Sequence, residues 1–177
     1  MTILQKFISK KTREALLYLL NLQEEPSTER RLARAVYFIE REAILRGGEP
    51  IIGCKLYFEN GFPAADIMGI VSEDFFSFTV KENNGEKYIY AATHQKLYGS
   101  LSDFDIKLIR EVYDQLRYYP NELPKNFFRS ILPEYIDTEK GERIEVTYMS
   151  LLRKNGYSLE ETADIIDDIE YGKKVQS

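Results

Sequence analysis

The feature that most constrains this chain is a helix in residues 26–46 that two glycines close. Its apolar side chains recur at helical spacing, and they are Leu32, Val36, Ile39 and Ala43. The Pro-Ser-Thr sequence at residues 26–28 separates this helix from the preceding segment and supplies its N-cap. Gly47 and Gly48 supply a C-cap, because glycine readily adopts the left-handed backbone that ends a helix. We therefore expect one well-defined helix with a single buried side.

Two further breaks follow this helix. Residues 50–58 begin with Pro-Ile-Ile-Gly, and their pattern fits either an extended segment or the start of a helix. Phe62 precedes Pro63, and proline is well tolerated at the first turn of a helix. We therefore expect a short helix there that continues through Ile67 and Ile70.

The strongest β signal lies in residues 76–90. Phe76, Phe78 and Val80 alternate with polar residues, an Asn-Asn-Gly turn follows, and Tyr-Ile-Tyr returns. This pattern is typical of an antiparallel hairpin. A lone hairpin is marginally stable in water, so we expect it to pack on helices. Phe76 and Phe78 are expected to help fill the core, as are Phe38 and Tyr113.

Five other segments have helical patterns, and they are residues 3–22, 102–117, 123–132, 144–154 and 158–171. Ser102 is followed by acids that suit a helix start, and Ser158 forms a capping box with Glu161. Residues 139–142 are polar and are expected to connect the helices predicted on either side of them.

These segments predict the α+β class, as a mainly helical single domain with one antiparallel β-hairpin packed on helices. We divide the chain into an N-terminal helical extension over residues 1–25, the α+β domain over residues 26–172 and a frayed tail over residues 173–177.

Composition narrows the class of protein further. Of the 177 residues, 44% are hydrophobic and 13% aromatic, which fits a folded domain with a real core. The net charge of −5 disfavours a general nucleic-acid binder, which needs a concentrated basic face. The single cysteine, Cys54, excludes an intramolecular disulfide and is expected in the core. Because no signal-peptide pattern or long apolar run is present, we expect a cytoplasmic protein without a membrane partner.

No segment carries a recognisable catalytic constellation. The single histidine, His94, has no nucleophile motif beside it, so we expect no catalytic residue. Asp164 and Asp168 lie one helical turn apart and could meet a hard cation. The isoleucines between them would form a buried stripe, and this explains the spacing more simply. The aspartates then lie on the solvated face of an amphipathic helix. We therefore expect no metal and no cofactor, with a metal-dependent enzyme kept as an alternative.

Two charge patterns lie on predicted helices. Glu40 and Glu42 lie beside Arg41, and we expect both to be exposed charges on the helix surface. Residues 151–161 resemble the helix, Gly-aromatic-Ser turn and second helix of some winged-helix regulators. A DNA-reading helix must present donors to bases and phosphates, and the second helix here is acidic instead. The acidic face favours a protein partner over nucleic acid.

Several short motifs resemble one family, the Panacea antitoxin domain, also described as the SocA-like or phage-associated protein domain. Members show a Leu-x-Tyr-Phe-x-x-Arg helix, where residues 35–41 read Ala-Val-Tyr-Phe-Ile-Glu-Arg. The family's Gly-x-Pro-Ile-x-Gly turn matches residues 48–53, and its Gly-Pro-Val step is altered here to Gly-Phe-Pro-Ala at residues 61–64. Its Leu-Ser helix start is similar to residues 101–102, and its last helix is similar to residues 156–161. Cys54 stands where the family commonly has an acidic residue, so the chain resembles a divergent member.

The resemblance implies a protein that performs no chemistry. Panacea domains neutralise unrelated toxins by binding them, and those toxins include small alarmone-synthetase-like enzymes that shut down translation. We therefore expect an antitoxin of a type II toxin–antitoxin pair, in a hetero-oligomer with its cognate toxin. The alternative is a phage or mobile-element adaptor, or a transcriptional regulator, without a toxin partner.

Aromatic residues near the family-like motifs are the candidate interface. Tyrosine and arginine are enriched at the energetic centres of protein interfaces. The candidate protein-binding residues are Tyr37, Arg41, Tyr57, Phe62 and Tyr157.

Overall fold

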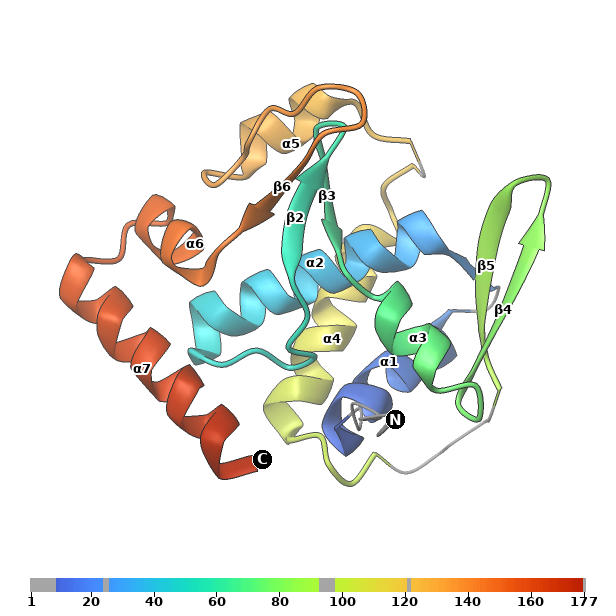
Figure 1. The fold of residues 1–177 in the computed structure, drawn as a ribbon, viewed down its shortest axis with the longest axis horizontal. Helices are drawn as coiled ribbons and strands as arrows, with labels where there is room; N and C mark the ends of the chain where they lie inside the picture. Colours follow the sequence, from blue (N-terminus) through green and yellow to red (C-terminus); the bar gives the residue numbers. More distant parts are fainter. Residues whose placement is uncertain (1–8, 24–25, 93–97, 121, 177) are drawn as a thin grey trace, which may run out of the picture.

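The computed structural model describes residues 9–23, 26–92, 98–120 and 122–176 (Figure 1). The fold is α+β and mainly helical, as predicted, with two three-stranded antiparallel sheets among these residues. The helices are α1 (Lys10–Leu22), α2 (Glu29–Gly47), α3 (Met68–Glu73), α4 (Asp103–Leu116), α5 (Lys125–Ile131), α6 (Tyr148–Lys154) and α7 (Leu159–Gln176). The strands are β1 (Ser27–Thr28), β2 (Leu56–Glu59), β3 (Phe62–Ala65), β4 (Phe78–Asn83), β5 (Glu86–Ala91) and β6 (Arg143–Val146).

Helix α2 crosses the middle of the molecule and is the centre of the core (Figure 1). Its predicted caps are confirmed. The Thr28 side chain accepts a hydrogen bond from the Arg31 N–H, and Gly48 closes the helix in a left-handed conformation with φ 73°. Helix α2 packs against β3 and against α4. Buried residues lie on more than one side of the helix, among them Leu32, Tyr37 and Ile44, so the core encloses α2 instead of covering the single side that was expected.

Helix α1 belongs to the same hydrophobic core. Ala15, Leu16 and Leu19 are fully buried in the cluster that includes α2. The helix begins at Lys10, because the Ser9 side chain caps it by accepting from the Thr12 N–H at 3.0 Å. Residues 3–8 of the predicted helix lie outside the described part of the chain. The predicted extension over residues 1–25 therefore contributes a core helix.

The predicted hairpin is confirmed as β4 and β5, which form a sheet in the order β1-β5-β4. Asn84 and Gly85 form its turn with positive φ, and β5 contacts α1 and α2. Phe78 is buried, but the expectation that Phe76 fills the core is wrong, because that side chain is 76% exposed. The chain turns at residues 74–77, so the strand alternation does not extend back to Phe76.

The second sheet, in the order β3-β2-β6, was not expected. Phe62 and Pro63 do not open a helix. They lie in β3, and the next helix begins only at Met68. The predicted helix over residues 144–154 is also partly wrong, because β6 occupies its beginning and pairs with β2. Thr147 then caps α6 by accepting from the Ser150 N–H.

The predicted N-caps of α4 and α7 are confirmed. Ser102 and Asp105 form a capping box on α4. Ser158 and Glu161 exchange the same pair of bonds at the start of α7, at 2.7 and 3.1 Å. Helix α7 packs against α6 and continues to Gln176, beyond the helix end predicted at residue 171.

The turn between β2 and β3 gives a direct test of the second sheet. Gly61 has φ 78°, and an added Cβ would lie 2.7 Å from Lys125 Cδ and 3.0 Å from Tyr135 Oη. We expect Gly61→Ala to lower the free energy of unfolding by about 2–3 kcal/mol, since left-handed backbone strain and crowding add. Gly141→Ala is the control, because φ is 85° there but the space is open. It should cost only about 1–2 kcal/mol. Equal losses in urea unfolding would contradict the packing of this turn.

Candidate protein-binding groove

A groove of about 580 Å³ lies where the second sheet meets the start of α2 and the tip of the β4–β5 hairpin. Its walls come from segments that are distant in the sequence. The residues that line it are Glu29, Arg30, Ala33, Arg34, Tyr57, Glu59, Asn60, Phe62, Pro63, Ala64, Gly85, Glu86, Lys87 and Glu122. Two of the five predicted interface residues, Tyr57 and Phe62, are among them.

Tyr57 is held on the second sheet by a stacked arginine. The Arg143 guanidinium lies 3.4 Å from the centroid of the Tyr57 ring, and Arg143 Nη2 lies 3.7 Å from Asp66 Oδ2. Burial raises the pKa of Tyr57, while Arg143 acts in the opposite direction. The Tyr57 ring is therefore a neutral, half-buried aromatic surface that Arg143 holds in position.

Phe62 lies on the apolar floor of the groove and packs against Phe128 in the core beneath it. The two ring centroids are 6.0 Å apart, and Phe128 is fully buried. The Arg34 guanidinium lies 5.2 Å from the Phe128 centroid and 6.0 Å from the Phe62 centroid. Burial lowers the pKa of Arg34, and the charge of Arg30 lowers it further. A cation stacked on two rings thus lies beside Phe62.

Charged side chains of both signs surround the groove, with one more acidic than basic residue. Four glutamates and three basic residues line it. Lys87 Nζ lies 4.0 Å from Glu29 Oε2. Glu59 and Glu122 form no ion pair within the described part of the chain. Glu86 accepts the Tyr88 hydroxyl at 3.1 Å and forms no ion pair with a described residue. Among the described residues, these three carboxylates therefore have no ion pair.

Tyr37 and Arg41 lie in a buried polar network away from the groove. Tyr37 is fully buried, and its hydroxyl donates to Glu134 Oε1 at 3.1 Å. Arg41 Nε donates to the same oxygen at 2.7 Å, and Arg41 Nη2 donates to Asn155 Oδ1 at 2.8 Å. Burial acts to lower the pKa of Arg41, but the hydrogen bond to Glu134 and the charges of Glu134 and Glu42 together raise that pKa. In this structure Tyr37 offers no surface to a partner.

Tyr157 joins the C-terminal helices to α2. Its hydroxyl donates to the Leu45 carbonyl, and the Arg153 side chain donates to the Tyr157 carbonyl at 2.8 Å. The ring is half-buried against the core. Tyr157 therefore has a packing role, and it does not line the groove.

Glu40 is a structural residue that the sequence interpretation missed. It was expected to be exposed, but it is fully buried. Its carboxylate accepts the backbone N–H groups of Ile51, Ile52 and Gly53 at 3.0, 2.6 and 2.9 Å. Its spacing from Val36 and Ala43 places it on the apolar stripe of α2, and that signal was available in the sequence. Glu40 thus fixes the Pro-Ile-Ile-Gly turn that the family resemblance singled out.

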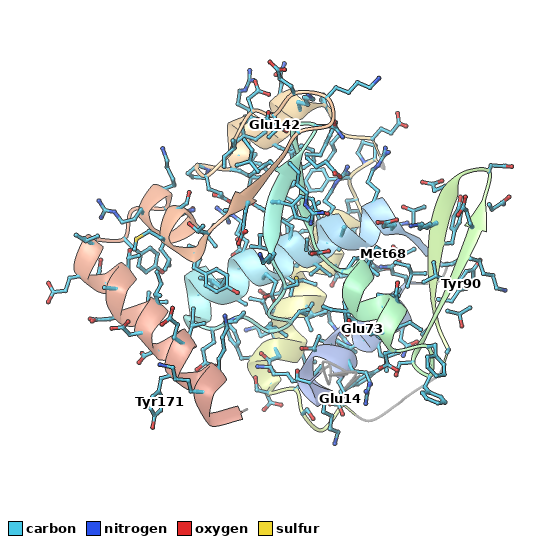
Figure 2. All side chains as sticks on the ribbon, in the orientation of Figure 1. Glu14, Met68, Glu73, Tyr90, Glu142 and Tyr171 are labelled. Carbon is cyan, nitrogen blue, oxygen red and sulfur yellow. The ribbon has the colours of Figure 1, made fainter. Side chains whose placement is uncertain are left out.

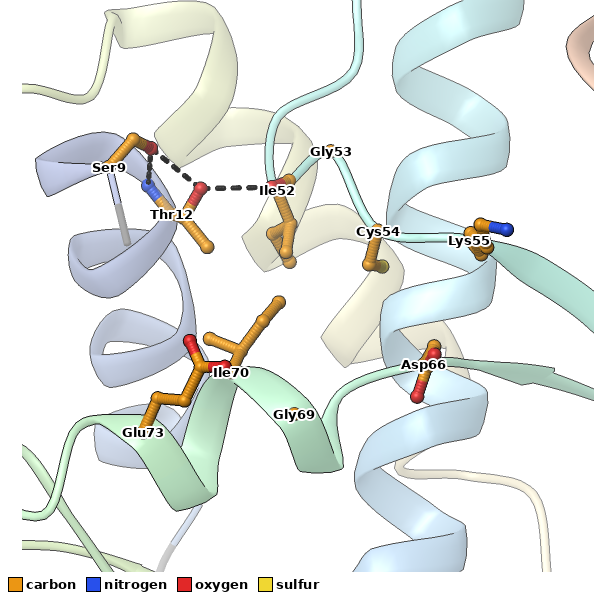
Figure 3. Close-up of a pocket in the computed structure, with 10 residues that line it drawn as sticks. All are labelled: Ser9, Thr12, Ile52, Gly53, Cys54, Lys55, Asp66, Gly69, Ile70 and Glu73. Carbon is orange, nitrogen blue, oxygen red and sulfur yellow. Dashed lines mark hydrogen bonds between the residues drawn. The ribbon is translucent and has the colours of Figure 1, made fainter. Parts of the chain in front are cut away.

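A second cleft of about 580 Å³ lies beside this turn (Figure 3). The Thr12 hydroxyl donates to the Ile52 carbonyl at 2.9 Å and so ties α1 to the turn. Cys54 lines the cleft and is buried, as predicted. Burial raises the pKa of the Cys54 thiol, and the charge of Glu40 raises it further. The thiol therefore stays protonated and is a poor nucleophile.

The other sequence candidates do not form a site with the groove. Asp164, Asp167, Asp168 and Glu170 are exposed on α7, while Ile169 is buried as the predicted stripe requires. Within the described ranges, no group of three or more histidine, cysteine, aspartate or glutamate side chains is placed to hold a metal ion. His94 lies outside those ranges.

Comparison with protein-family models, with curated proteins and with solved structures finds no match for this chain. None of the helices in the described part of the chain has the length and apolar composition needed to cross a membrane. The groove geometry is therefore the main structural guide to function.

Proposed function

We propose that this protein is the antitoxin of a type II toxin–antitoxin pair and neutralises a translation-inhibiting toxin by binding it directly. The observation that carries the proposal is the groove, which brings Tyr57, Phe62 and Arg34 together from two separate parts of the fold. Aromatic and arginine side chains around a half-apolar concave surface are typical of the energetic centre of a protein interface. The family resemblance supplies the identity of the partner class.

The chemistry of the groove specifies the segment of toxin that it accepts. An apolar side chain would contact Phe62 and Pro63 on the floor. Lysine or arginine side chains beside it would meet Glu59, Glu86 and Glu122, of which Glu59 and Glu122 lack an ion-pair partner in the described chain. A basic segment with an apolar anchor therefore fits this surface, and steering by the glutamates would speed association.

Replacing Tyr57 and Phe62 with alanine should abolish neutralisation. Truncating one such anchor typically costs about 2 kcal/mol or more of binding free energy, roughly a 30-fold rise in Kd. The measurement is growth of cells that express the adjacent gene together with wild-type or variant chain, followed by pull-down of the complex. Tyr171→Ala is the matched control, because Tyr171 is 71% exposed on α7, far from the groove (Figure 2).

A charge-reversal pair separates binding from folding. Glu59→Lys and Glu122→Lys remove carboxylates that form no ion pair with a described residue, so urea unfolding should change little. Neutralisation should weaken with them. If the charge variants neutralise normally and the alanine variants unfold, then Tyr57 and Phe62 are core residues and the groove is not the interface. A harmless neighbour with no complex would favour the adaptor or regulator alternative.

A further inference from the structure

The β4–β5 hairpin has an open edge. Strand β4 is six residues long and is the outer strand of its sheet, in the order β1-β5-β4. Every residue of β4 after Phe78 is exposed, and no described strand pairs with its outer side. An unprotected edge of this kind presents backbone donors and acceptors to another chain. Figure 1 shows the hairpin at the side of the molecule opposite α7.

The register identifies which backbone groups are open. In a hairpin with a two-residue turn, the residues that flank the turn exchange hydrogen bonds, and bonded pairs then alternate along the ladder. Asn83 pairs with Glu86, and at the far end the Ala92 N–H donates to the Ser77 carbonyl at 2.7 Å. The N–H and C=O groups of the intervening residues point away from β5, and these residues are Phe78, Val80 and Glu82.

We propose that the β4 edge pairs with β4 of a second copy of this chain, antiparallel, across a two-fold axis at Val80. With the axis there, Val80 lies opposite Val80 of the second copy, and Phe78 lies opposite Glu82. All three outward-facing residues of each strand then find partners. Moving the axis by one or two residues toward the turn would place Lys81 opposite Lys81 or Glu82 opposite Glu82. Like charges in those positions are destabilising, which disfavours both of those registers.

The same arrangement covers the most exposed aromatic pair. Phe75 and Phe76 are 68% and 76% exposed, and their ring centroids are 4.3 Å apart. They lie directly before β4, where the second copy's hairpin turn arrives in the Val80 register. Exposed apolar clusters of this kind mark interaction surfaces. The edge and the aromatic pair therefore point to one continuous interface between identical chains.

Val80→Pro tests the pairing while sparing the hairpin. Proline lacks the N–H that faces outward at this position, and it is tolerated on edge strands for that reason. Val80→Thr is the matched control, because it keeps both the N–H and the β-branched shape. In sedimentation at about 100 μM, a concentration that populates a weak interface, the wild type and Val80→Thr should dimerise and Val80→Pro should be monomeric. Circular dichroism checks that Val80→Pro is folded.

A disulfide experiment tests the register independently. Across the axis, Val80→Cys would place two Cα atoms about 5.5 Å apart, within disulfide range. Glu82→Cys would place them about 14 Å apart along the strands, beyond that range. Homodimer formation under mild oxidation should therefore occur only with Val80→Cys, since native Cys54 is buried. A wild type that stays monomeric, equal crosslinking of both variants, or an edge that only a toxin strand occupies would overturn the proposal.

Discussion

Arg41→Ala should lower the free energy of unfolding by about 3–5 kcal/mol, one of the two largest effects expected from a single substitution here. Arg41 Nε donates to Glu134 Oε1 at 2.7 Å, and the Glu134 side chain is fully buried. Removing the guanidinium leaves that carboxylate inside the protein with only the neutral donors Tyr37 and Asn155. Urea unfolding, with an unchanged m-value, measures the loss.

Two further variants separate the buried pair from other causes. Glu42→Gln removes the second carboxylate that Arg41 contacts, at 2.6 Å, but Glu42 is 30% exposed and its loss should cost under about 1 kcal/mol. Adding Glu134→Gln to Arg41→Ala removes the stranded charge and should recover part of the stability. If Arg41→Ala costs no more than Glu42→Gln, the buried network does not hold α2 to the segment after α5.

Glu40→Ala should destabilise the fold on a similar scale, about 3 kcal/mol or more. Three backbone N–H groups lose their acceptor, and each buried donor left unsatisfied costs about 1–3 kcal/mol. The affected turn at residues 51–53 also receives the hydrogen bond from Thr12. The variant should therefore loosen α1 as well, which hydrogen exchange of the α1 amides would show.

Glu40 also predicts a pH dependence of stability. Burial raises the pKa of Glu40 from 4.5 to about 7, against the opposing effects of the three amide donors and Lys11. The folded state binds this proton more tightly than the unfolded state does. The contribution of Glu40 to the free energy of unfolding is therefore complete below pH 4.5 and is lost as pH rises through about 7.

Glu40→Gln isolates this titration because glutamine has no charge to change. The variant should be more destabilising at pH 5 than at pH 8, by on the order of 3 kcal/mol. Urea unfolding of both proteins at the two pH values gives the difference. Equal destabilisation, or a larger effect at pH 8, would mean that the three amides keep the carboxylate ionised in the folded protein.

The helix ends were predictable because their signals are local. Thr28, Gly48 and Ser102 act within one turn of the helix that they cap, so a short window of sequence contains both partners. The β4–β5 hairpin was predictable for the same reason, since its turn and both strands are adjacent.

The second sheet depends on contacts that the sequence does not display locally. Leu56 pairs with Val146, and both strands are only four residues long. Pro63 suggested a helix start, but it is also tolerated in an edge strand, which is where β3 lies. Residues 143–146 could have continued a helix, and pairing with β2 overrides that preference.

The candidate site was predictable only in part. Tyr57 and Phe62 were chosen from sequence and meet at one groove, whereas Arg34, Glu59 and Glu122 reach it only through the folding of separate segments. Tyr37 was chosen with them, but its helical position on α2 places it in the core. Aromatic identity alone does not distinguish an interface residue from a core residue.

Hydrogen exchange of the purified chain, alone and with the product of the adjacent gene, tests most directly whether the groove binds a protein toxin. The proposal predicts slower amide exchange in residues 56–65 and at the start of α2 when the partner is present. Residues 159–171 of α7 should exchange at the same rate in both samples. Protection confined to α7 or to other surfaces, or no change anywhere, would contradict toxin binding through the groove.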